Sequence, residues 1–123
     1  MSLPMLHVYT LSTCDTCRRA VKWLKANGIP FEERAIRETP PTPDELRAML
    51  VRQGGALRKL FNVSGREYRE QKLGEKLPGL TEADALKLLA SNGSLVKRPF
   101  AVGRGVGLVG FDEAEWAATL KRS

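Results

Sequence analysis

Short apolar runs and one amphipathic segment fill the first third of the chain. Residues 5–10 combine aliphatic, β-branched and aromatic side chains, which predicts a first strand. Residues 15–27 carry apolar side chains at helical spacing, and Asn27-Gly28 ends the predicted helix. Residues 31–36 alternate as in a second strand. This order predicts a βαβ unit with parallel strands and a right-handed crossover.

Helix start signals dominate the middle of the chain. Thr42, Pro43 and Glu45 suit the N-cap, N1 and N3 positions of a capping box, and the glycine pair at 54–55 ends that helix. A short second helix is predicted over 56–61.

Residues 62–79 interrupt the helical pattern. They contain three glycines, a proline and little apolar periodicity, so we expect mostly loop. Thr81 and Asp84 then begin another helix, which ends at Asn92-Gly93.

The last third returns to strands. Residues 99–102 and 106–111 predict a hairpin that turns at 103–105, and Asp112 caps a final helix over 113–121.

The complete order of elements is βαβ, a helical insert and then ββα. It predicts an α/β chain with a thioredoxin-like fold and a four-stranded mixed sheet. We expect a single domain over residues 5–123, with the insert at about 38–95. The length of 123 residues suits one such domain.

Composition narrows the class of protein. Hydrophobic residues make up 42% and charged residues 28%, which argues against disorder. No apolar run approaches the roughly 20 residues that span a bilayer, so we expect no membrane-spanning segment and no membrane partner. Residues 1–4 carry no basic side chain of a signal peptide, and we expect a cytoplasmic protein. The net charge of +6 favours anionic partners or simply solubility, but no basic run predicts direct nucleic-acid binding.

Both cysteines lie just after the first predicted strand, in the sequence CDTC. Cys14 falls at or beside the N-cap of the first helix, where free N–H groups and the helix dipole favour a thiolate. Cys17 lies one turn later on the same face, so a reversible disulfide is feasible, with Cys14 attacking and Cys17 resolving.

Other interpretations of this pair remain open. Cys17 also fits a small buried apolar position in the amphipathic pattern. A structural zinc site needs about four ligands, whereas the chain offers one CxxC and a single histidine, His7, which suits an ordinary strand position. We therefore expect no metal and no bound cofactor.

Three stretches, TCDTCRRA, VKRPF and LVGFDEAEW, together resemble the arsenate reductase-like (ArsC/Spx/YffB) family, most of all its YffB-like and Spx-like branches. The resemblance covers nearly the whole chain and implies a thioredoxin-like fold with a helical insert. It also implies that Cys14 is the nucleophile, that Arg98 points at it, and that Pro99 lies beside the site after a cis peptide bond. The catalytic candidates are Cys14, Cys17 and Arg98, and the candidates for binding an oxyanion or thiol substrate are Thr13, Asp15, Thr16, Arg58, Asn62 and Pro99.

The sequence also differs from that of the glutaredoxin-dependent arsenate reductases in this family. Asn62 stands where we expect an arginine, Arg58 lies one turn earlier, and Arg104 falls in the predicted hairpin turn. Fewer cations should bind a divalent oxyanion more weakly. The resemblance therefore favours a glutathione-dependent thiol–disulfide oxidoreductase, with glutathione as co-substrate and glutathione, glutaredoxin or thioredoxin as reductant. A genuine glutaredoxin-dependent arsenate reductase is an alternative.

A second hypothesis comes from the Spx-like branch. The chain would then be a redox-sensing transcriptional regulator that binds the RNA polymerase α-subunit, with Gly54 or Gly55 on the binding face. Its switch would be the Cys14–Cys17 disulfide. We expect a monomer under either hypothesis.

Overall fold

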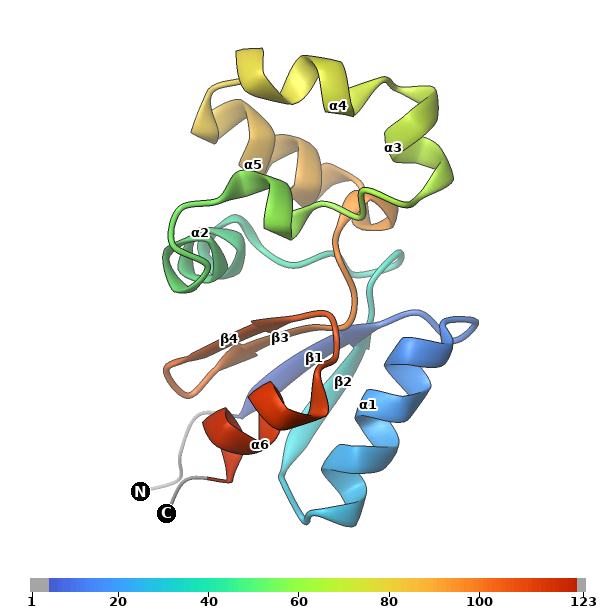
Figure 1. The fold of residues 1–123 in the computed structure, drawn as a ribbon, viewed down its shortest axis with the longest axis vertical. Coiled ribbons are helices and arrows are strands. Elements are labelled where there is room, and N and C mark those ends of the chain that lie inside the picture. The colour runs from blue at the N-terminus through green and yellow to red at the C-terminus, as the bar shows by residue number, and fades with distance from the viewer. Residues whose placement is uncertain (1–4, 122–123) are drawn as a thin grey trace.

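A four-stranded mixed sheet forms the middle of the molecule (Figure 1). The computed structural model describes residues 5–121, so the expectation about residues 1–4 lies outside it. The strand order is β2-β1-β3-β4. β1 pairs with β2 in parallel and with β3 antiparallel, and β3 and β4 form an antiparallel hairpin. The strands are β1 Leu6–Thr10, β2 Phe31–Ala35, β3 Phe100–Gly103 and β4 Val106–Val109. The predicted α/β thioredoxin-like fold is confirmed.

Helices cover both faces of this sheet. Helices α1 (Asp15–Ala26) and α6 (Glu113–Leu120) lie on one face, and the helical insert lies on the other (Figure 1). The insert consists of α2 Pro43–Arg52, η1 Leu57–Leu60, α3 Arg66–Glu70, α4 Leu73–Lys76, η2 Leu77–Gly79, α5 Glu82–Ser91 and η3 Gly93–Leu95.

Alternation along β1 explains the two layers. Leu6 and Val8 pack into the cluster beneath the sheet with Trp116, whereas Tyr9 packs into the cluster under the insert with Phe100. Successive side chains of a strand point to opposite faces, so one short strand contributes to both cores.

The helix starts follow the predicted caps. The Thr42 hydroxyl accepts the Glu45 N–H at 3.1 Å, and the Glu45 carboxylate accepts the Thr42 N–H at 3.0 Å. Asp112 caps α6 through the Glu115 N–H. The hairpin turn also lies where it was predicted, with Arg104 at φ +58.

The prediction that residues 62–79 are mostly loop is wrong. They form α3, α4 and η2, which are too short for helical periodicity to stand out between glycines. Tertiary packing sustains them, since Tyr68 and Leu73 are buried and the Tyr68 ring lies 6.1 Å from that of Phe61.

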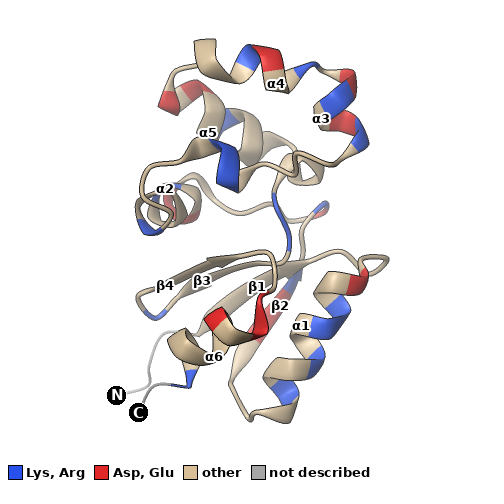
Figure 2. Cartoon of the chain, viewed as in Figure 1, with Lys and Arg blue, Asp and Glu red and all other residues tan. Residues whose placement is uncertain are grey.

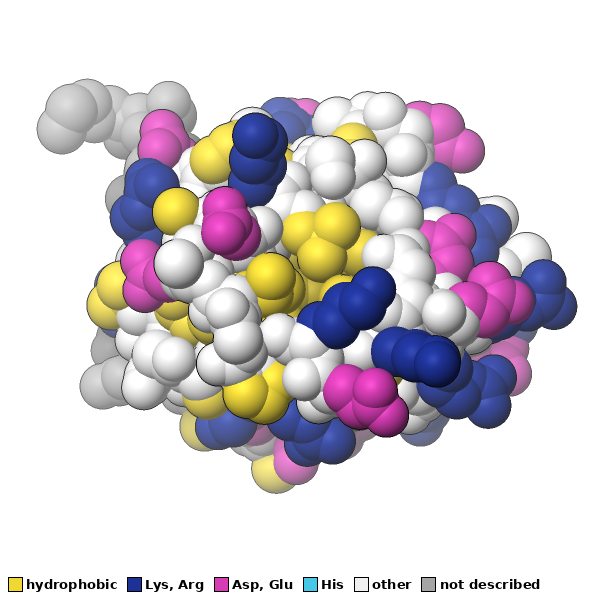
Figure 3. All heavy atoms as spheres, turned by 90° about the horizontal axis from the view of Figure 1, so that it is seen from above, with side chains coloured by type: hydrophobic (Ala, Val, Ile, Leu, Met, Phe, Trp, Pro, Cys, Tyr) yellow, Lys and Arg dark blue, Asp and Glu magenta, His cyan; other side chains and the backbone are white. Residues whose placement is uncertain are grey.

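The outer face of the insert is partly apolar. Hydrophobic side chains gather near its centre between charged ones (Figure 3). The partly buried hydrophobic residues packed on the core under the insert include Leu57, Val63, Leu77, Leu80 and Leu88. Within residues 5–121, no helix is long and apolar enough to cross a membrane.

Candidate functional site

Cys14 is the N-cap residue of α1. Its backbone is extended, at φ −93 and ψ 114, and its N–H donates to the Leu11 carbonyl at 3.0 Å, which closes the turn after β1. The Cys14 Sγ accepts the Cys17 backbone N–H at 3.4 Å. The sulfur therefore occupies the place of a capping oxygen, as the sequence predicted.

This environment lowers the pKa of Cys14. Burial of the half-buried thiol works against the anion, but hydrogen bonds from the Cys17 backbone and side chain, the charge of Arg98 and the Thr16 N–H outweigh it. Each of these groups stabilises a thiolate, which is the nucleophilic form.

Cys17 has the opposite character. It is buried with 1% of its surface exposed, and burial together with the neighbouring Cys14 raises its pKa to about 12. Both cysteines are free thiols. The pair therefore combines an accessible sulfur that favours the anion with a protonated one behind it.

Arg98 comes to this site from the end of the insert. Its Nη1 donates to the Ser94 carbonyl at 3.3 Å, and its charge contributes to the low pKa of Cys14. The Arg98–Pro99 peptide bond is cis, as the resemblance implied. The Pro99 carbonyl accepts the Gly110 N–H at 2.9 Å, which fixes this segment beside β4.

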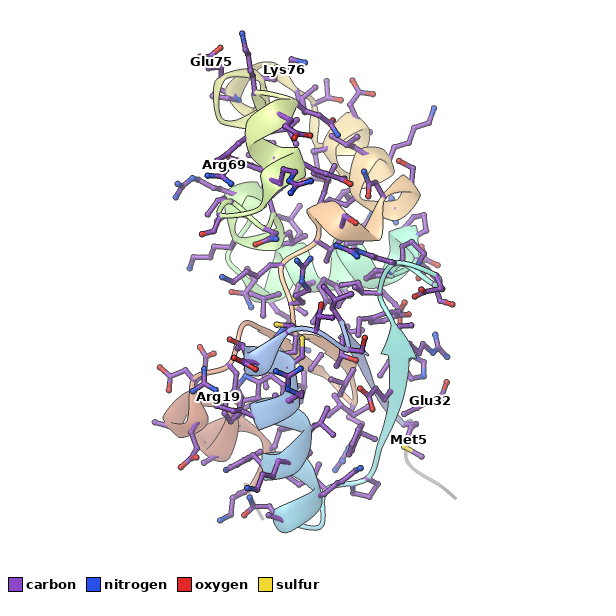
Figure 4. All side chains as sticks on the ribbon, turned by 90° about the vertical axis from the view of Figure 1, so that its right-hand side faces the viewer. Met5, Arg19, Glu32, Arg69, Glu75 and Lys76 are labelled. Carbon is purple, nitrogen blue, oxygen red and sulfur yellow. The ribbon has the colours of Figure 1, made fainter. Side chains whose placement is uncertain are left out.

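The loop residues around Cys14 take different positions. Thr13 and Asp15 are exposed, and Asp15 pairs with Arg18, whose Nη1 also donates to the Ser12 carbonyl at 2.8 Å. Arg18 is thus committed to the loop before α1. Thr16 is half-buried and faces Cys14 with its backbone N–H. Arg19 projects to the outside of the molecule (Figure 4).

Arg58 lies on η1, and Asn62 lies just after it. Arg58 is exposed on η1 and lines a hollow with Lys59 and Lys97, and neither cysteine lines that hollow. Asn62 donates its N–H to the Leu95 carbonyl at 2.7 Å, in the segment that precedes Arg98. Arg98 acts through its charge on both cysteines, and Pro99 follows it directly in the chain. The binding roles of Arg58, Asn62 and Pro99 stay predictions.

A polar network under the insert was not expected from the sequence. The Glu45 carboxylate accepts from the Tyr9 hydroxyl at 2.5 Å and lies 3.0 Å from His7 Nδ1, and Arg34 donates to the Tyr9 hydroxyl at 3.0 Å. Burial and the bond to Glu45 raise the pKa of Tyr9 to about 12. His7 is therefore more than the ordinary strand residue predicted, and it helps to dock α2 on the sheet. Its alternating position on β1, facing the insert, was the signal.

Within the described chain, no group of three or more histidine, cysteine, aspartate or glutamate residues is placed to hold a metal ion. The site thus consists of a thiolate-favouring cysteine at a helix start, a buried second thiol, and an arginine before a cis-proline. A thioredoxin-like fold that presents a cysteine in this way forms a site suited to thiol chemistry.

Comparison with known proteins shows the family to which the chain belongs. The ArsC family model matches residues 9–119, and the chain belongs to the ArsC family. YusI of Bacillus subtilis is 43% identical over 111 residues, which cover 90% of this chain and 94% of YusI. The global transcriptional regulator Spx of Enterococcus faecalis is 34% identical over 118 residues, or 96% of this chain and 88% of Spx. The structure of an ArsC family related protein from Bacteroides fragilis has a TM-score of 0.85 at 42% identity, covering 92% of this chain and 95% of that one.

Proposed function

We propose that this protein is a glutathione-dependent thiol–disulfide oxidoreductase with Cys14 as its nucleophile. The observation that carries the proposal is the hydrogen bond from the Cys17 N–H to the Cys14 Sγ, reinforced by the charge of Arg98. Both favour a thiolate on a half-exposed sulfur, which a nucleophile needs.

The substrate class that we propose is a mixed disulfide R–S–S–G between glutathione and another thiol. The Cys14 thiolate attacks the glutathione sulfur, so that a Cys14–S–S–G bond forms, the S–S bond of the substrate breaks, and R–S⁻ leaves and takes a proton from solvent. A second glutathione thiolate then attacks the glutathione sulfur of the adduct. Oxidised glutathione forms, and Cys14 returns as the thiolate. One glutathione thiol is consumed in each turnover, and its thiolate supplies the electron pair that releases Cys14. The other half of the oxidised glutathione is the glutathionyl group of the substrate.

Cys17 offers a second way to resolve the adduct. Its sulfur attacks the Cys14 sulfur, glutathione leaves with the Cys17 proton, and a Cys14–Cys17 disulfide remains for an external reductant such as glutaredoxin or thioredoxin. While Cys14 is a thiolate, its charge contributes to the high pKa of Cys17. Adduct formation removes that charge, so Cys17 should become easier to deprotonate only after the first step.

The small number of cations near the Cys14 sulfur makes a disulfide a better substrate than arsenate. Arg98 acts on Cys14 through its charge, whereas Arg58 lines another hollow and Asn62 carries no charge. A divalent oxyanion gains most from several guanidinium groups, whereas a neutral disulfide needs only the thiolate and a donor for the leaving sulfur.

The experiment is a turnover assay with the mixed disulfide of glutathione and 2-mercaptoethanol, in which formation of oxidised glutathione is measured. We expect turnover by the native chain and by Cys17→Ser, and none by Cys14→Ser. Arg69→Gln is the control, since this exposed arginine lies on α3 of the insert (Figure 4). Turnover that persists in Cys14→Ser, or a native rate equal to the uncatalysed one, would refute the proposal.

The second candidate is an Spx-like regulator that binds the RNA polymerase α-subunit. It is favoured by the likeness to Spx together with two free cysteines three residues apart. Its switch requires the Cys14–Cys17 disulfide, so capture of the α-subunit should depend on oxidation and be lost in Cys17→Ser. Capture that is indifferent to Cys17→Ser would exclude the disulfide switch, and capture without glutathione turnover would exclude the enzyme.

A further inference from the structure

A basic groove runs between the insert and the β3–β4 hairpin. We call it the insert–hairpin groove, and it consists of two adjoining hollows of ≈ 560 Å³ and ≈ 750 Å³. Both hollows are lined by Gln53, Lys59 and Glu115, so they are continuous with one another. Neither cysteine lines them, and the groove is distinct from the thiol site.

Five cationic side chains line this groove against a single carboxylate, that of Glu115. The cations come from the end of α2, η1, the segment before β3 and the hairpin turn, where Figure 2 also shows Lys and Arg. They are Arg52, Arg58, Lys59, Lys97 and Arg104. None of the five forms an ion pair or a side-chain hydrogen bond with another residue of the range 5–121.

The side chain of Arg52 reaches the hairpin turn that carries Arg104. A Cβ atom built on Gly107 would lie 2.7 Å from the Arg52 Cβ, so the side chain of Arg52 runs across the strand where only glycine leaves room. Its Nη2 would lie 3.6 Å from a Cβ on Gly105, the neighbour of Arg104. Two guanidinium-bearing residues are thus brought to one turn, where like charges repel unless an anion lies between them.

The other half of the groove is more apolar. Ala56, Phe61, Val63 and Val109 line the smaller hollow together with Arg58 and Lys97. The larger hollow instead has glycine backbone at residues 54, 105 and 107, which lets a ligand approach main-chain N–H groups closely. Arg58, Lys59 and Lys97 also line the smaller hollow, so both halves are cationic. The complementary ligand is therefore anionic and carries a group with an apolar face that fits the smaller hollow.

We propose that the insert–hairpin groove binds a nucleoside polyphosphate. The phosphates lie against Arg52 and Arg104 at the turn, where guanidinium groups form bidentate bonds to phosphate oxygens. The base lies in the hollow beside Val63 and Val109. This site does not depend on the chemistry of Cys14.

The test is calorimetric titration of the full chain with ADP. The matched probes are adenosine, tripolyphosphate and a single-stranded oligonucleotide. The variant is the double substitution Arg52→Gln with Arg104→Gln, and its control is Arg47→Gln, an exposed arginine on α2 that pairs with Asp44. Thermal unfolding checks that each variant is folded, and amide chemical shifts of Gly105 and Gly107 locate the ligand in the native chain.

We expect ADP to bind, the double substitution to weaken binding by about tenfold or more, and Arg47→Gln to leave it unchanged. Adenosine should bind far more weakly than ADP, and the shifts should change at Gly105 and Gly107. Absence of ADP binding, equal loss in the Arg47→Gln control, or shifts elsewhere would overturn the site. Tripolyphosphate binding as tightly as ADP would overturn the base subsite, and binding of the oligonucleotide alone would reassign the groove to nucleic acid.

Discussion

The guanidinium of Arg98 donates a hydrogen bond through Nη1 to the carbonyl oxygen of Ser94, 3.3 Å away. Ser94 belongs to η3, the last turn of the insert, so the cation that acts on Cys14 is held by the insert and not by the sheet alone. The helical insert is thereby part of the thiol site.

Arg98→Gln should raise the pKa of Cys14, because it removes a positive charge that stabilises the thiolate. Alkylation of Cys14 by iodoacetamide at neutral pH should slow by about threefold to tenfold. Arg69→Gln is the matched control, since that exposed arginine lies on α3 of the insert, and the alkylation rate of this variant should equal that of the native chain. Equal effects of the two substitutions would show that only general surface charge matters.

Gly93→Ala should destabilise the fold strongly. A Cβ at this position would lie 1.8 Å from the Ile36 carbonyl oxygen, so η3 must move away from the end of β2. We expect a loss of about 3 kcal/mol, the upper end for overpacking, measured by urea unfolding. Gly79→Ala is the control, because a Cβ there meets no atom within 4 Å. Similar unfolding midpoints for the two variants would contradict this close approach.

Glu45→Gln should lower stability at neutral pH by about 2 kcal/mol. Burial works against the Glu45 anion, but bonds from the Thr42 N–H, Tyr9 and His7 lower its pKa below the ordinary value. Because the pKa of Glu45 is lower in the folded chain than in the unfolded chain, the ionised carboxylate stabilises the fold at pH values above the unfolded pKa of about 4.3. This stabilisation is lost as the pH falls through the folded-state pKa. The gap between variant and native chain should therefore narrow in acid.

Unfolding free energies measured from pH 7 down to pH 3 check this prediction about Glu45. Glu82→Gln is the control, since this exposed glutamate lies in the first turn of α5. If the difference in unfolding free energy between the native chain and Glu45→Gln stays constant with pH, the charge of Glu45 contributes nothing to stability.

Trp116→Ala should cost about 3–5 kcal/mol, as large core truncations do. Trp116 is fully buried, its indole N–H donates to the Gly110 carbonyl at 3.1 Å, and its ring lies 5.1 Å from that of Phe111 and 6.3 Å from that of Trp23. Trp116→Phe should lose less, because it keeps the aromatic contacts. Guanidinium unfolding distinguishes the two, and a loss below about 1 kcal/mol for Trp116→Ala would be inconsistent with this packing.

Local sequence signals predicted the helix caps, because a cap depends only on residues close together in the chain. The capping box of Thr42, the cap at Asp112 and the N-cap position of Cys14 each involve residues three apart, and all three are confirmed. The helices α3 and α4 were missed because Tyr68 and Leu73 sustain them by packing into the core under the insert, which also includes Tyr9 and Val102.

Contacts between residues far apart in the sequence could not be predicted from the hydrophobic and polar pattern. The contact of Glu45 with Tyr9 and His7 joins positions 36 and 38 residues apart. The insert–hairpin groove likewise gathers cations from four separate segments, so no basic run marks it. The placement of Arg98 was available only because the sequence resembles a family, since an arginine before a strand is otherwise unremarkable.

The most direct measurement is the alkylation rate of the native protein by iodoacetamide as a function of pH, with the modified residue identified by mass spectrometry. The thiolate at the start of α1 predicts that Cys14 alone is labelled, with a midpoint below that of an ordinary cysteine, while Cys17 is spared by burial and its pKa of about 12. A midpoint at or above that of an ordinary thiol, or preferential labelling of Cys17, would contradict it.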